Sequence, residues 1–150
     1  MSQMQRLGCN FDEGAGMHEQ LDKLRSLLHL LYPTFYDYLC QCDIVNLFFA
    51  YRWLLLDFKR EFAFTEVLQL WETIWSRHRT HSISLFIALA VIDVYGLPLV
   101  ERKLSSDQVL EFFNSLANHM DVSAVLRTMR AVRRRRRRRR KREEEEEEKE

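Results

Sequence analysis

Apolar residues recur along this chain at the three- and four-residue spacing of amphipathic helices, and the alternation typical of strands is almost absent. The first such pattern covers 17–31, and Pro33, a favourable first-turn residue, starts a second, short helix. A third helix is expected to begin near Asp43 or Asn46 and to run to about Phe62. This part of the chain therefore predicts helices packed on helices.

The pattern continues in the second half of the chain. Thr65 is the expected cap of a helix that runs through Trp75. The run over 85–96 is apolar on nearly all sides and predicts a central buried helix, which Gly96 and Pro98 are expected to stop.

Two more helices complete the pattern. Ser105 or Ser106 is expected to begin one of them, and Asp121 is expected to cap the last one, which runs through Val132. Only four glycines and two prolines interrupt the whole chain. The sequence therefore predicts an all-α, multi-helix bundle of about seven helices.

Charge divides the chain into unlike parts. Residues 133–150, RRRRRRRRKREEEEEEKE, hold 11 of the 23 basic and 7 of the 22 acidic side chains, which gives this segment a net charge of +4 and the preceding 132 residues a net charge of −3. We interpret 133–150 as a low-complexity Arg/Glu tail and 17–132 as the helical domain. Residues 1–16 contain three glycines and few apolar side chains, and we interpret them as the remnant of an upstream domain half.

The tail has two interpretations. Ten consecutive basic residues, Arg133 to Arg142, would bind nucleic acid or an anionic membrane through salt-sensitive phosphate contacts. The glutamates that follow would neutralise much of that affinity, which favours a solvated low-complexity extension.

Cysteine usage indicates a reduced chain in the cytoplasm, because Cys9, Cys40 and Cys42 have no framework spacing and no signal peptide precedes them. Cys40-x-Cys42 with Asp43 could begin a zinc site, but no second pair follows at suitable spacing, so we expect free thiols and no metal or cofactor. No arrangement around the histidines favours nucleophilic catalysis, and no glycine-rich phosphate loop is present. The most apolar window, 85–94, is too short to span a bilayer.

Arg52 stands among aromatic and leucine residues in FFAYRWLLLDFKREF (48–62) and has two interpretations. An arginine finger, which stabilises charge on a transferring phosphoryl group, must project from a mobile element, and the wall of a helix is badly placed for that role. An ion pair is therefore favoured. At about 100° per residue Glu61 would point away from Arg52, so the expected partner is Glu72 or Asp43.

Four blocks stand in a specific order in the chain: RLGCNF (6–11), GMHEQL (16–21), LFFAYRWLLLDFKREF (47–62) and LQLWETIW (68–75). With these gaps they resemble the second half of the TBC domain found in Rab GTPase-activating proteins. The match extends through SLFIALAVI (84–92) and QVLEFFNSLANHMD (108–121), so the resemblance covers nearly all of residues 4–130.

The resemblance implies the helical fold of the C-terminal lobe of a TBC domain. It also implies a Rab-family small GTPase as partner, a role in vesicle traffic through accelerated GTP hydrolysis, and a cytoplasmic location, peripheral on endomembranes. In the family, the catalytic arginine lies in an I-x-x-D-x-x-R motif and the catalytic glutamine in a Y-x-Q motif.

Neither catalytic motif occurs in this chain. We therefore expect no catalytic, cofactor-binding or metal-ligating residue and no GTPase-activating activity of the chain alone. The chain is expected to start downstream of both motifs, as a truncated gene model, a fragment or a degenerate paralogue would. Leu7, Phe11 and the apolar side of the helix over 17–31 are expected to form the surface that the missing half would cover. The alternative is a non-catalytic helical module that binds a Rab or another protein.

Overall fold

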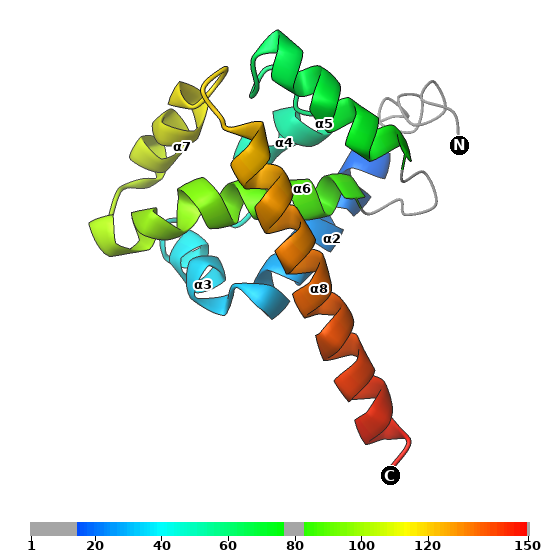
Figure 1. The fold of residues 1–150 in the computed structure, drawn as a ribbon. Coiled ribbons are helices and arrows are strands. Elements are labelled where there is room, and N and C mark those ends of the chain that lie inside the picture. Colours follow the sequence, from blue (N-terminus) through cyan, green and yellow to red (C-terminus); the bar gives the residue numbers. More distant parts are fainter. Residues whose placement is uncertain (1–14, 77–82, 150) are drawn as a thin grey trace.

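The computed structural model describes residues 15–76 and 83–149. These two ranges form a helical bundle and contain no strand (Figure 1). Seven α-helices form it: α2 (Ala15–Leu31), α3 (Pro33–Gln41), α4 (Phe48–Leu55), α5 (Phe64–Ser76), α6 (Ile83–Val91), α7 (Ser106–Ser115) and α8 (Val122–Glu147). A π-helix, η1 (Ile92–Gly96), and a 3₁₀ helix, η2 (Leu97–Arg102), join α6 to α7. The prediction of an all-α bundle of about seven helices is confirmed.

Helix α6 is the centre of the bundle, because eight of its nine residues are buried. It contacts α2, α4 and α8, and α8 crosses it in Figure 1 before extending beyond the other helices. The helical run Ile83–Arg102 has the length and composition of a membrane span, and about two thirds of its most apolar window is buried inside the fold. The buried core helix of a folded domain can have the same length and composition, so we interpret this run as the core of the bundle.

Gly96 and Pro98 do not stop this run, contrary to the prediction. The α-helical hydrogen bonding ends at Val91, and the path continues as a π turn, in which the Leu97 N–H donates to the Ile92 carbonyl. Gly96 lies where the path passes two aromatic rings, since a Cβ at this position would lie 3.2 Å from Phe35 and 3.3 Å from Phe113. A side chain at this position would therefore force one of the rings to shift by a few tenths of an ångström.

Helix α4 is shorter than predicted, because it ends at Leu55 and not near Phe62. Asp57 and Phe58 adopt left-handed backbone conformations, with φ of 46° and 62°, which reverse the chain. A left-handed residue with a side chain costs roughly 1–2 kcal/mol. Phe58 is completely buried, and its N–H donates to the Trp53 carbonyl at 2.8 Å, so packing and hydrogen bonding offset that cost.

Three of the predicted helix starts are confirmed. Ser105 caps α7 in a reciprocal capping box with Gln108, and Asp121 caps α8 by accepting from the N–H groups of Ser123 and Ala124, as predicted. Pro33 also lies where it was predicted, in the first turn of α3.

Two predicted caps are wrong. The residue before α4 is Leu47 in a left-handed conformation, although the Asn46 side chain does accept from the Phe48 N–H at 3.2 Å. Helix α5 begins at Phe64, so Thr65 lies inside its first turn.

Helix α8 does not end near Val132 but continues without a break through the arginine run to Glu147.

Candidate functional site

Arg52 and Glu61 form a bidentate ion pair at the end of α4. The Arg52 Nε donates to Glu61 Oε1 at 2.9 Å, and Nη2 donates to Oε2 at 3.1 Å. The Glu61 side chain is completely buried, whereas 31% of the Arg52 side chain is exposed. The predicted ion pair is thus confirmed, and both partners are fixed in one planar arrangement.

The predicted partners of Arg52 are wrong, because neither Glu72 nor Asp43 pairs with it. The prediction extended α4 to Phe62 and so placed Glu61 on the opposite face. In the structure the left-handed residues after α4 turn the chain back and carry Glu61 to the side of Arg52. Trp71 fixes this turn by donating its indole N–H to the Asp57 carbonyl at 2.7 Å.

This geometry limits what Arg52 can do chemically. Two of its donors are committed to a buried carboxylate, which would be left uncompensated if the guanidinium moved away. A residue that stabilises a transferring phosphoryl group must reach into a partner's site with its donors available. Arg52 is therefore a structural cation in the surface of the bundle.

A second polar cluster surrounds Tyr32, between α2 and α3. The Tyr32 hydroxyl donates to the Asp93 carboxylate of η1, and the Arg135 guanidinium lies 5.1 Å from the centre of the Tyr32 ring. Burial raises the pKa of the Tyr32 phenol well above its usual range, and the bonded carboxylate raises it further. The cluster joins three segments that are distant in sequence, but its phenol stays protonated near neutral pH.

The two described cysteines do not converge on a metal site. Cys40 is exposed, and Cys42 donates its thiol hydrogen to the Leu104 carbonyl at 3.5 Å. Within 15–76 and 83–149, no three histidine, cysteine or carboxylate side chains are grouped as metal ligands. Cys9 lies outside these described ranges.

The apolar side of α2 is buried, contrary to the prediction that it would form an uncovered surface. Met17, Leu21, Leu24 and Leu28 are each at most 3% exposed because α3, α4 and α6 pack against this helix. The other two residues of that predicted surface, Leu7 and Phe11, lie outside the described part of the chain.

Large apolar side chains are exposed instead on α4 and α5. Phe48 and Tyr51 of α4 are 62% and 38% exposed, and Phe64, Leu68 and Trp75 of α5 are 75%, 47% and 38% exposed. At about 100° per residue the three α5 side chains fall within roughly 40° of one another, on one face. Their helical spacing was visible in the sequence, but spacing alone does not say which apolar face lacks a partner.

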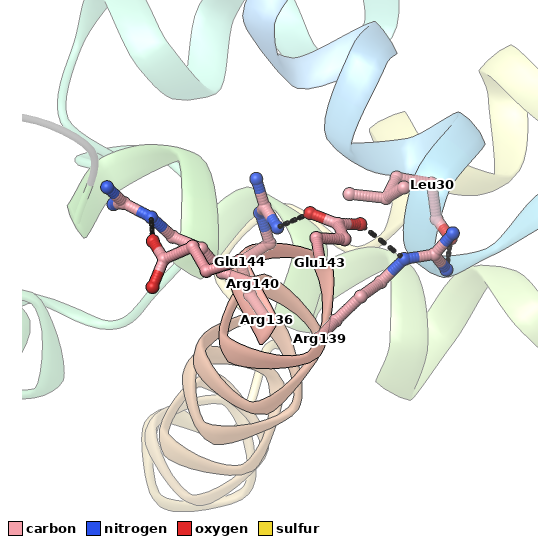
Figure 2. A network of polar contacts seen from close by, with 6 residues as sticks. All are labelled: Leu30, Arg136, Arg139, Arg140, Glu143 and Glu144. Atoms are coloured by element: carbon pink, nitrogen blue, oxygen red, sulfur yellow. Dashed lines mark hydrogen bonds and ion pairs between the residues drawn. The ribbon is translucent and has the colours of Figure 1, made fainter. Parts of the chain in front are cut away.

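The arginines of α8 are held by two kinds of contact. Arg139 donates to the Leu30 carbonyl at 3.0 Å and pairs with Glu143 at 3.2 Å (Figure 2). Arg136 approaches the same Glu143, and Arg140 pairs with Glu144, as Figure 2 also shows. One turn earlier, Arg135 donates to the Leu31 carbonyl at 3.1 Å. Arginine side chains thus satisfy carbonyl groups that the last turn of α2 leaves without helical partners.

Comparison with known proteins places this architecture in a family. The sequence model described as Rab-GTPase-TBC domain matches residues 1–99. TBC1 domain family member 16 of Homo sapiens is 42% identical over 118 residues, which cover 77% of this chain and 15% of that protein. Small G protein signaling modulator 2 of Mus musculus is 35% identical over 130 residues, which cover 85% of this chain and 13% of that protein.

A yeast relative agrees with these matches. GTPase-activating protein GYP7 of Saccharomyces cerevisiae is 36% identical over 107 residues, which cover 71% of this chain and 14% of that protein. The chain therefore spans 13–15% of the length of these relatives. From the family match over two thirds of its residues, together with its all-helical fold, the chain belongs to the Rab-GTPase-TBC domain family.

Proposed function

We propose that this chain is part of a Rab GTPase-activating domain, which regulates GTP hydrolysis in vesicle traffic, and that it supplies no catalytic side chain itself. The family membership supports the general role, and the yeast relative GYP7 carries the words GTPase-activating protein in its name. The observation that carries the second part is the position of Arg52, whose donors are bound to the buried Glu61.

GTP hydrolysis needs two contributions from an activating protein of this type. A cation offsets the charge that develops on the transferring phosphoryl group, and a polar side chain orients the attacking water. The chain contains neither an I-x-x-D-x-x-R nor a Y-x-Q motif, the two that supply these groups in TBC domains. The proposed contribution of this chain is therefore to scaffold the domain and to contact the Rab.

A single-turnover GTP hydrolysis assay with a panel of purified Rabs tests this proposal. The chain alone should leave every rate within about twofold of the intrinsic value, whereas a cation supplied at the phosphoryl group raises such rates by about 10³ to 10⁵. A tenfold rise with any Rab would overturn the non-catalytic role. The Arg52→Lys variant would then decide whether Arg52 is the group responsible.

A second candidate function is a non-catalytic interaction module that binds a Rab or another protein partner. The exposed apolar face of α5, formed by Phe64, Leu68 and Trp75, favours it, because large apolar side chains grouped on a surface mark binding sites. Titration of the chain into Rab loaded with a non-hydrolysable GTP analogue tests it. Binding that Leu68→Asp abolishes, without any change in GTP hydrolysis, would favour this module.

We also propose a cytoplasmic location with peripheral contact to endomembranes. The thiol of Cys40 is exposed and unbridged, which suits a reducing compartment, and the proposed Rab partner acts at membrane surfaces. Fractionation of cells that express the tagged chain is the test. Recovery from a sealed, protease-protected compartment would contradict this location.

A further inference from the structure

One face of α8 carries a row of exposed cations, which we call the outer arginine stripe: Arg127, Arg130, Arg134 and Arg137. At about 100° and 1.5 Å per residue, the four positions fall within an arc of roughly 80° and along about 15 Å of the helix. Arg130, Arg134 and Arg137 also line, with Arg133, a shallow hollow of about 310 Å³. No residue other than arginine contributes to the lining of this hollow.

The acidic end of α8 does not neutralise the stripe by pairing with it. The glutamates that form ion pairs, Glu143 and Glu144, pair with Arg136, Arg139 and Arg140. In the described part of the chain, no carboxylate lies within ion-pair distance of the four stripe residues. The arginines of α8 therefore differ in their contacts. Arg136, Arg139 and Arg140 pair with glutamates of the same helix, whereas the four stripe residues are exposed to solvent.

The surroundings of α8 decide which anionic partner fits the stripe. Buried residues on the opposite side of the helix, such as Val125 and Met129, pack into the bundle, where α8 contacts α5 and α6. Arg135 and Arg139 bind carbonyl groups of α2 on a further side. Beside the bundle, the stripe is therefore the face of α8 that is open to a partner, which suits an extended anionic surface.

The lining of the hollow argues against single-stranded nucleic acid. Proteins that bind single strands combine cations with aromatic platforms on which bases stack. The hollow on α8 contains arginines and no aromatic ring. A partner that matches it offers many phosphate groups on a flat surface and needs no stacking.

We propose that the outer arginine stripe binds the surface of a bilayer that contains anionic phospholipids. Each basic residue near such a surface contributes an attraction that falls off within a Debye length, about 8–10 Å at physiological salt. This inference is independent of the proposed role in GTP hydrolysis, because it rests on the charge pattern of α8 alone.

Vesicle sedimentation of the full chain tests the proposal. Vesicles of phosphatidylcholine with phosphatidylserine are compared with vesicles of phosphatidylcholine alone, at low and high KCl. The test variant is Arg130→Gln/Arg134→Gln/Arg137→Gln. The matched control is Arg136→Gln/Arg139→Gln/Arg140→Gln, which removes the same charge from the same helix but on the paired side. Circular dichroism confirms that both variants are folded.

The wild-type chain should bind the anionic vesicles, should not bind the neutral ones, and should be released by high salt. The stripe variant should lose affinity on the order of 100-fold, and the control should lose less than about fivefold. Equal losses in both variants would overturn the proposal, since net charge and not the stripe would then decide binding. Equal binding to neutral vesicles would also overturn it, as would a short DNA or RNA duplex that binds more tightly than the anionic vesicles.

Discussion

Arg52 stabilises the fold by compensating the charge of Glu61 inside the bundle. Replacing Arg52 with leucine should lower the free energy of unfolding by about 3–5 kcal/mol, because the completely buried carboxylate loses both hydrogen bonds of its partner. Urea unfolding measures the loss, and Arg60→Leu, which changes a neighbouring exposed arginine, is the control. The double variant Arg52→Leu/Glu61→Leu should recover part of the stability. A loss of less than 1 kcal/mol would contradict the structural role.

Tyr32 gives the stability of the protein a dependence on alkaline pH. Burial and the Asp93 carboxylate raise the pKa of the folded-state phenol, whereas the unfolded value is about 10. Below that value the phenol is protonated in both states. As the pH rises above it, the unfolded state loses its proton first, so stability should fall by up to about 1.4 kcal/mol per pH unit.

The Tyr32→Phe variant isolates this effect. Urea unfolding between about pH 8 and 11 should show a shallower loss of stability in the variant than in the wild type. Some loss should remain, because burial also raises the pKa of Tyr38. Tyr51→Phe, which changes an exposed phenol, is the control. Identical slopes in Tyr32→Phe and the wild type would show that Tyr32 does not couple folding to pH.

The sequence indicated that Arg52 takes part in an ion pair, but it could not identify the partner. Glu61 lies only nine residues away, and it reaches Arg52 through two consecutive left-handed residues, Asp57 and Phe58. The turn contains no glycine, so the sequence pattern predicted that the helix would continue through it. The tertiary packing of Phe58 stabilises a backbone conformation that local preference disfavours.

At the scale of elements, the helix starts that use a polar side chain were the most predictable part of the fold. Asp121 accepts from the N–H groups of Ser123 and Ala124 at 2.9 and 3.2 Å. Asp121→Ala should therefore cost about 0.5–2 kcal/mol of stability. Thermal unfolding measures it, with Ser123→Ala as a control that keeps the backbone donor. A change below about 0.5 kcal/mol would mean that water replaces the cap without loss.

Elements that depend on packing could not be predicted in this way. The end of α6 was assigned to Gly96 and Pro98, the usual residues that stop a helix, yet the path continues through them. At Gly96 it passes so close to the rings of Phe35 and Phe113 that a side chain would crowd them. Likewise, the apolar spacing of α2 and α5 is similar in the sequence. Only the packed bundle shows that α2 is covered and that one face of α5 is not.

At the scale of the whole molecule, the acidic end of α8 opposes the attraction of its arginines for anions. Removal of 143–150 takes away seven glutamates and one lysine, which changes the formal net charge from +1 to +7. It also frees Arg136, Arg139 and Arg140 from their ion pairs. The shortened chain should bind anionic vesicles at least about tenfold more tightly at low salt. Unchanged affinity in the sedimentation assay would mean that the glutamates do not reach the bound surface.

The π turn at Ile92–Gly96 fixes how the residues after α6 are rotated about the helix axis relative to α6. A π turn holds about one residue more than an α turn, so it displaces the following residues by roughly one position. Two connections depend on this rotation: Asp93 accepts from Tyr32, and the Tyr95 hydroxyl accepts from the Asp121 N–H at 2.7 Å, at the start of α8. Deleting a single residue from this turn would rotate one connection out of register with the other. The hydrogen bond between Tyr95 and the start of α8 thus depends on one inserted residue, and it acts together with the packing of α8 against α5 and α6.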